Sequence, residues 1–260
     1  MRLYDIHCHL QSTRFAEDIG CILSRAEEAG IAAVLNAATE PSDWLLVRSL
    51  EKYSLCRSAL GIHPCYTPAN AEQFLAACTD SVFNGITAIG EIGLDSICAP
   101  VPLDRQLDIF RRQLSIAKDL KLPAVIHCRG AFAELIQCAK EIGIPYGAAV
   151  HAFNGSAELA ADLIRHGFDI SVGGVLTYRD SRKRAAMLKE IYPDHILFET
   201  DAPDIPPAEK KHERNEPSYL RLILAAASEI LGVPEEIIAQ NAEANTLKLF
   251  PRLAGSHNAL

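Results

Sequence analysis

Residues 3–9 read LYDIHCH, a short apolar run that ends in two histidines separated by one residue. Because side chains alternate along a strand, His7 and His9 are expected to point to the same side of the chain. Two imidazoles held in this way on a rigid strand can form half of a metal site. A polar strand end that happens to carry histidines explains such a pattern more often. The metal-site interpretation therefore depends on further ligands from the rest of the chain.

The rest of the chain alternates short apolar or β-branched runs with amphipathic helical segments. The clearest helix begins at Asp104, and Leu122-Pro123 ends it. A last helical segment, residues 234–250, is expected to pack on the outside of the domain. The expected strands cover residues 3–6, 32–35, 57–61, 87–90, 124–126, 147–150, 168–172 and 196–199.

Eight strands with helices between them, and no linker-like stretch, predict an α/β fold in the form of one (β/α)8 TIM barrel. We expect residues 1–260 to form a single TIM-barrel domain that includes the extra C-terminal helix. An open doubly wound sheet is the alternative architecture. That fold would normally place a Gly-rich phosphate loop after the first strand, where this chain has histidines.

The composition limits the class of protein and its partners. Hydrophobic residues make up 49% of the 260 residues, yet no apolar run approaches the ~20 residues that span a bilayer, so no membrane partner is expected. The eight cysteines form no Cys-x-x-Cys pair, and almost nothing precedes the first motif, which favours reduced thiols in the cytoplasm. No required protein partner is evident.

The charge distribution bears on nucleic-acid binding. A net charge of −8 argues against a protein that holds long duplex DNA by its backbone, because such proteins usually present a basic face. The local basic stretches are residues 179–184 and 210–214. Charge runs of this kind are mostly solvated surface, and we expect that here. A nucleic-acid substrate would therefore be held by metal ions and a local patch.

Several potential ligands directly follow expected strands, whose carboxyl ends all meet at one rim of a TIM barrel. Any single histidine could be a hydrogen-bonded core residue, but a random scatter would not place five on one rim. The residues at this rim are His7, His9, His63, His127, His151, Glu91 and Asp201.

Six of these residues are expected to bind metal: His7, His9, Glu91, His127, His151 and Asp201. Imidazoles and carboxylates together suit Zn²⁺ or Mn²⁺ better than an all-oxygen Mg²⁺ site. Six ligands exceed what one catalytic ion needs, because that ion must keep a position open for water. We therefore expect two divalent metal ions that share a carboxylate, activate water and stabilise a leaving oxygen.

Six motifs follow one another along the chain: DIHCH at 5–9, GEIGLD at 90–95, IHCR at 126–129, HAFNGS at 151–156, ETDAP at 199–203 and RNEP at 214–217. In this order they resemble the TatD family of metal-dependent hydrolases, and the resemblance covers residues 4–250. It implies a TIM barrel of the amidohydrolase type. Characterised members of that family include magnesium-dependent deoxyribonucleases that remove nucleotides from DNA ends.

The same resemblance implies how the ligands are shared. One ion would be bound by His7, His9, Glu91 and Asp201, and the other by Glu91, His127 and His151, with Glu91 as the bridge. Two positions depart from the family's pattern. Cys65 stands where a histidine often follows His63-Pro64, and Ser96 stands where many relatives have tyrosine. These departures alter the expected substrate contacts and leave the metal ligands intact.

The resulting hypothesis is phosphodiester hydrolysis by metal-activated water, with a DNA end or another phosphodiester as the substrate. Asp201 and the shared carboxylate Glu91 are the expected catalytic residues, and Asp201 accepts or relays the proton. Arg129 is expected either to contact a phosphate or to form a structural salt bridge. His63 is expected to hydrogen-bond the substrate or to orient a ligand.

Two other functions remain open. The same metal arrangement polarises carbonyl groups, so the chain could be an amidohydrolase or esterase acting on a C–N or acyl ester bond, as in deacylation of aminoacyl-tRNA. The acidic net charge and Cys65 favour that alternative over a nuclease. A non-enzymatic metal-dependent binding protein is the third possibility. Retention of every expected ligand argues against it.

Overall fold

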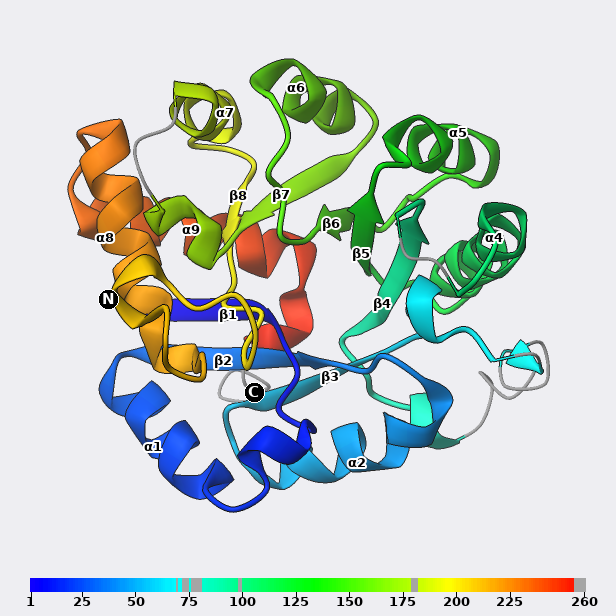
Figure 1. The fold of residues 1–260 in the computed structure, drawn as a ribbon, viewed down its shortest axis with the longest axis horizontal. Helices are drawn as coiled ribbons and strands as arrows, with labels where there is room; N and C mark the ends of the chain where they lie inside the picture. The colour runs from blue at the N-terminus through cyan, green and yellow to red at the C-terminus, as the bar shows by residue number, and fades with distance from the viewer. Residues whose placement is uncertain (69, 72–74, 76–80, 98–99, 179–181, 255–260) are drawn as a thin grey trace, which may run out of the picture.

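The computed structural model describes residues 1–68, 70–71, 75, 81–97, 100–178 and 182–254. Eight parallel strands follow one another in sequence order around a barrel, and helices cover the outside (Figure 1). The strands are β1 Leu3–Cys8, β2 Ile31–Ala37, β3 Cys56–Leu60, β4 Ala88–Asp95, β5 Ala124–Arg129, β6 Ala148–Val150, β7 Phe168–Val172 and β8 Ile196–Phe198. The α-helices are α1 Ile19–Glu28, α2 Trp44–Ser49, α4 Leu103–Asp119, α5 Phe132–Ile142, α6 Ala157–Arg165, α7 Arg182–Ile191, α8 Leu220–Leu231 and α9 Glu235–Leu249. The predicted TIM barrel is confirmed.

Hydrogen bonds at the carboxyl ends of the first and last strands link β1 and the residue after it to the segment that follows β8. The amide of His9 donates to the carbonyl oxygen of Ala202 (2.7 Å), and the amide of Asp201 donates to that of His7 (3.0 Å). The buried carboxylate of Asp5 adds a side-chain link, because it accepts the amide (2.9 Å) and the hydroxyl (2.5 Å) of Thr200. Two segments almost 200 residues apart in sequence are thereby fixed beside each other at the barrel mouth.

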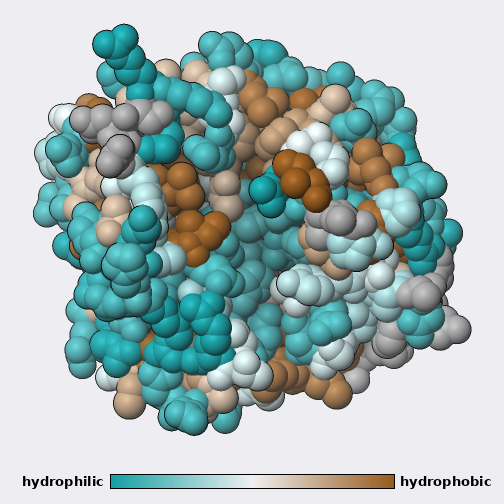
Figure 2. Space-filling model, viewed as in Figure 1, coloured by the Kyte–Doolittle hydropathy of each residue, from teal (hydrophilic) through white to brown (hydrophobic). Residues whose placement is uncertain are grey.

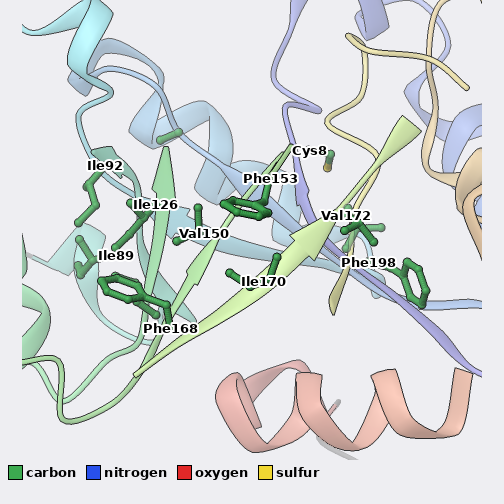
Figure 3. Close-up of a cluster of buried hydrophobic side chains, with 14 of the residues drawn as sticks. Cys8, Ile89, Ile92, Ile126, Val150, Phe153, Phe168, Ile170, Val172 and Phe198 are labelled. Carbon is green, nitrogen blue, oxygen red and sulfur yellow. The ribbon is translucent and has the colours of Figure 1, made fainter. Parts of the chain in front are cut away.

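The strands carry two separate layers of buried side chains. The outer layer packs against the helices and includes Ile126, Val150, Ile170 and Phe198, which Figure 3 shows along neighbouring strands. Cys8 belongs to this outer layer, as expected of a small packing residue. The inner layer fills the barrel below its mouth and contains many alanines. Its members are Tyr4, Ile6, Ala33, Leu35, Ala37, Ala59, Ala88, Val125, Ala149, Leu197, Leu249, Phe250 and Leu253.

The C-terminal helix α9 ends inside this inner layer. Its Leu249, and Phe250 and Leu253 just beyond it, are buried among the small residues of the barrel interior. The Asn245 amide group in α9 donates to the carbonyl oxygens of Pro193 (2.8 Å) and Ile196 (3.1 Å), at the start of β8. The extra C-terminal helix is present as predicted, but the end of its segment enters the barrel interior instead of lying on the outside. Alanines leave the lower barrel too empty to close by itself, so the end of the chain fills it.

Four strands, β1, β2, β4 and β5, continue further than their hydropathy predicted. β1, β4 and β5 run through His7, Glu91 and His127, which were expected to follow the strands. The physical reason is that a polar side chain at the barrel mouth does not interrupt the backbone ladder. His127, for example, still pairs with Gly93 of β4. The site residues consequently sit on strands more rigidly than loop residues would.

Candidate metal centre and active-site cleft

The six expected metal ligands meet at the carboxyl ends of the strands. Three overlapping groups have potential ligand atoms within 4.8 Å of one another: His7, His9 and Asp201; His7, Glu91 and His151; and His63, Glu91 and His127. Glu91 is 2% exposed and His7 is fully buried, so the centre lies at the floor of the mouth. The donor set of imidazole nitrogens and carboxylate oxygens fits borderline divalent cations.

Glu91 divides its two carboxylate oxygens between two sides of the centre. Its Oε2 lies 3.5 Å from Nε2 of both His7 and His9. Its Oε1 lies 2.8 Å from Nε2 of His151 and 3.1 Å from Nδ1 of His127. Asp201 belongs to the first side, because its Oδ1 is 3.5 Å from the same nitrogens of His7 and His9.

In His9 and His127, one ring nitrogen points away from the centre and contacts an acceptor. That contact determines which ring nitrogen faces the centre. Nδ1 of His9 lies 2.9 Å from the carbonyl oxygen of Ala37, which can only accept a proton, so Nε2 presents its lone pair inward. Nε2 of His127 lies 3.1 Å from the Asp95 carboxylate, which leaves its Nδ1 free to face inward. Both rings are therefore oriented as metal-binding histidines usually are.

His63 has the opposite arrangement. Its Nδ1 accepts the backbone amide of Cys65 (3.1 Å), so the neutral ring carries its proton on Nε2. That nitrogen points to Glu91 Oε1 at 3.4 Å. Burial lowers the pKa of His63 to about 4, which keeps the ring neutral. His63 thus presents an N–H donor to the centre, whereas a metal ligand needs a lone pair.

Both carboxylates are ionised. Burial by itself raises the pKa of Glu91, but the surrounding His63, His151 and His7 hold it well below the usual range. Burial likewise raises the pKa of Asp201, and the adjacent His9, His151 and His7 outweigh that effect and lower it. Two buried negative charges at one site call for positive charge close by, from the histidines or from cations.

Backbone strain is concentrated beside these residues. Asp201 has φ +59° and Ala152, next to His151, has φ +46°, a region that residues other than glycine seldom adopt. Gly93 has φ +151°, and a Cβ there would lie 1.8 Å from the carbonyl oxygen of His127. The second glycine of the GEIGLD motif is thus required for β4 to lie close to β5.

Two buried carboxylates beside the centre, Asp95 and Glu199, were not among the predicted site residues. Asp95 is buried at the end of β4 and holds His127, as described above. Glu199 is fully buried, accepts the amide of Ala152 (2.5 Å) and lies 3.6 Å from Nδ1 of His151. The strand was predicted to end at Gly90, and the contact of Asp95 with His127 depends on how β4 pairs with β5, so the sequence contains no direct signal for it.

The centre opens into a wide cleft of ≈ 1140 Å³. Figure 2 shows it as a mostly hydrophilic hollow with hydrophobic patches on its rim. Arg129, at the end of β5, and Lys183, in the first turn of α7, both line it. Among the described residues Arg129 has no carboxylate partner, so the structure contains no salt bridge of the kind considered for it.

Ser156 caps α6 by accepting the amide of Leu159 (3.3 Å), as a turn-forming residue does.

Of two expectations about surface chemistry, the one for residues 210–214 is confirmed and the one for the cysteines is not. The stretch at 210–214 is surface: Lys210 pairs with Glu213 (3.0 Å), and Arg214 with Asp18 (2.6 Å). Cys65 is disulfide-bonded, so the expectation that every cysteine is a reduced thiol is wrong. The other described cysteines are free thiols: Cys8, Cys21, Cys56, Cys128 and Cys138. Cys78, Cys98 and residues 179–181 lie outside the described residues.

In the described ranges no helix has the length and apolarity needed to cross a membrane.

Comparisons with known proteins give consistent matches over almost the whole chain. A family model described as "TatD related DNase" matches residues 4–251. The uncharacterised metal-dependent hydrolase YabD of Bacillus subtilis is 32% identical over 251 residues, covering 95% of this chain and 98% of that protein. The 3'-5' ssDNA/RNA exonuclease TatD of Erwinia billingiae is 30% identical, covering 95% and 98%. The crystal structure of the TatD homologue YjjV from Escherichia coli superposes with a TM-score of 0.89 at 32% identity, covering 96% and 98%.

Proposed function

Because this chain belongs to the family of TatD related DNases, a family of metal-dependent hydrolases, we propose that it cleaves phosphodiester bonds at DNA ends with two divalent metal ions. The observation that carries this proposal is the division of the Glu91 oxygens between two sets of histidines. A carboxylate placed in this way can bridge two cations. The exonuclease name of the Erwinia relative supports a nucleic-acid substrate.

The proposed ligand sets follow the two sides of Glu91. His7, His9 and Asp201 would hold one ion on the Oε2 side, and His127 and His151 would hold the other on the Oε1 side. His63 lies near the second set but carries its proton on the inward nitrogen, so we exclude it as a ligand. The nitrogen-rich donor set favours Zn²⁺ or Mn²⁺ over Mg²⁺.

The residues of the chain have distinct proposed roles. Bound divalent ions would lower the pKa of water and neutralise charge on the phosphoryl oxygens. Asp201, ionised and 13% exposed in its side chain, would accept the proton of the attacking water. His63 would donate its Nε2 proton in a hydrogen bond to a phosphoryl oxygen. Arg129 would bind a phosphate from the rim of the cleft.

A substrate panel tests the proposal. Purified protein supplied with Mn²⁺, Zn²⁺ or Mg²⁺ is assayed on a labelled single-stranded oligonucleotide, bis(p-nitrophenyl) phosphate and simple amides and acyl esters. We expect cleavage of both phosphodiesters and loss of turnover in Glu91→Ala and Asp201→Asn. Full metal-dependent turnover in either variant would disprove the assignment. Cleavage of amides or esters alone would favour the amidohydrolase alternative, and an inert metal-loaded protein would favour a binding role.

A further inference from the structure

The proposed function does not use Lys183, yet its side chain faces the active-site cleft. Lys183 lies in the first turn of α7 and lines the same cleft as Glu91, His151 and Arg129. Its Nζ donates to the carbonyl oxygen of Asn154 at 2.9 Å, which fixes the ammonium group at the rim. The neighbouring Arg184 has a different contact, because it donates to the carbonyl oxygen of Tyr178. Lys183 is exposed, as expected of this basic stretch, but its ammonium group is held at the rim of the cleft.

The cleft is positive on one side only. Arg129 and Lys183 lie beyond β5 and β7, and neither has a carboxylate partner in the described part of the chain. Glu40 and Asp43 lie across the cleft, beyond β2. An anionic substrate is attracted to the side of Arg129 and Lys183 and repelled from the side of the two carboxylates. The charge therefore favours binding along the positive side of the cleft.

Apolar side chains lie on the same side as the two cations. Phe132 of α5, Leu159 of α6 and Val175 line this part of the cleft. Phe132 is only partly buried and contacts the buried Phe153 edge to face, with ring centroids 5.8 Å apart. Cations with apolar surface near them suit a nucleic-acid strand, in which phosphates alternate with flat bases.

We infer that Lys183 binds a phosphate next to the one that is cleaved, so that the preferred substrate is a nucleic-acid strand with at least two phosphates. This inference rests on the proposed phosphodiesterase activity. A substrate with one phosphodiester, such as bis(p-nitrophenyl) phosphate, reaches the metal centre without needing Lys183. A longer strand gains affinity from the ammonium group of Lys183.

A thymidine trinucleotide with two phosphates tests the inference. In Lys183→Ala, kcat/KM for it should fall about tenfold, mainly through KM, while that for bis(p-nitrophenyl) phosphate stays unchanged. Two analogues each carry one uncharged methylphosphonate in place of one of the two phosphates. With the analogue whose remaining phosphodiester is still cleaved, the wild type should lose a similar factor and the variant nothing further. The slope of log kcat/KM against log salt should flatten by about 0.7.

Lys189→Ala is the matched control, because Lys189 is an exposed lysine in the last turn of the same helix and does not line the cleft. It should behave like the wild type on every substrate. Equal kinetics of Lys183→Ala and wild type on the trinucleotide would overturn the inference and leave the proposed function intact. An equal loss on both substrates would also overturn it, because Lys183 would then act on the site as a whole. If the wild type cleaves neither phosphodiester, the proposed function itself fails.

Discussion

The two ring nitrogens of each histidine at the barrel mouth have different neighbours. His9 and His127 each have an outer nitrogen tied to an acceptor, Ala37 and Asp95, so that a lone pair faces inward. His63 has its outer nitrogen tied to a donor. Distances alone group His63 with Glu91 and His127, whereas the protonation pattern separates it from them.

His63→Ala and His127→Ala should therefore differ in what they lose. His127→Ala removes a proposed ligand, and we expect less metal per protein together with lower activity. His63→Ala removes only a hydrogen-bond donor, so kcat should fall about 10²-fold while the metal content stays unchanged. Metal content is measured by inductively coupled plasma mass spectrometry after gel filtration, beside steady-state kinetics.

Cys8→Ala is a suitable control, because Cys8 follows a proposed ligand in sequence but its side chain is buried in the outer layer. It should retain both metal and activity. Loss of metal in His63→Ala to the same extent as in His127→Ala would show that His63 is a ligand.

The sequence predicts which residues lie at this rim better than it predicts their hydrogen-bond partners. His7, His9 and Asp201 could be identified because each ends or follows an apolar run. The orientation of His63 depends on the amide of Cys65, a contact that forms only in the folded chain. Asp95 was missed because its role depends on β5 lying beside β4 in a particular register.

At the scale of elements, the residues at the end of α9 and just beyond it form part of the core of the lower barrel. Phe250 is fully buried among inner-layer residues that include several alanines. Phe250→Ala should lower the free energy of unfolding by about 3–5 kcal/mol, because it opens a cavity that small neighbours cannot fill. Urea unfolding followed by circular dichroism measures this. Molecules that remain folded should keep their kcat, because Phe250 lies at the opposite end of the barrel from the centre.

Ile237 lies in α9 and is 45% exposed, so it provides the control. Ile237→Ala should change the free energy of unfolding by no more than about 0.5 kcal/mol. Equal effects of the two substitutions would mean that the end of the chain does not help to stabilise the barrel.

The ion pair between α1 and the segment before α8 predicts a pH dependence. Burial raises the pKa of Glu216, but hydrogen bonds from Arg25 and Ser218 outweigh it and hold the pKa below the usual range. A lowered folded-state pKa stabilises the protein above the ordinary glutamate pKa and stops doing so as the pH falls through the folded-state value. Arg25→Ala should therefore cost about 1–2 kcal/mol at neutral pH, with a smaller difference from wild type below about pH 4.

Chemical denaturation across pH checks this expectation. Arg111→Ala is the control, because Arg111 and Glu141 (3.2 Å) are both more than 40% exposed, and their pair should contribute little at any pH. A difference between Arg25→Ala and wild type that did not change with pH would argue against a role for Glu216 ionisation.

The elements themselves were predictable because each apolar run has a defined period. β7 matches its predicted range, Phe168–Val172, since no polar site residue follows it directly. β4 was predicted to stop at Gly90 and continues to Asp95, because the buried polar residues of the mouth still pair along the ladder. The position of α9 could not be predicted, since the pattern of one helix does not show which cavity its last residues fill.

For the whole molecule, bound metal should act on stability as well as on activity. Glu91 is buried, the side chain of Asp201 is 13% exposed, and both carboxylates are ionised, so bound cations would neutralise their charge. A ligand present at 100 times its dissociation constant stabilises the native state by about 2.7 kcal/mol. Chelation should therefore lower Tm and abolish turnover, and Zn²⁺ or Mn²⁺ should restore both.

Differential scanning calorimetry with and without chelator measures the shift. Glu91→Ala should lose this response to chelator, because it lacks the shared carboxylate. An unchanged Tm on chelation of the wild type, with metal loss verified, would contradict the proposed centre.

The filled lower barrel also determines how a strand can move. Leu249, Phe250 and Leu253 occupy the interior below the centre, so in the described part of the chain a strand cannot be threaded through the barrel. Substrate enters and product leaves by the same mouth. A released nucleotide must clear the cleft before the shortened strand can advance, so mononucleotide product should compete with incoming substrate for the same opening.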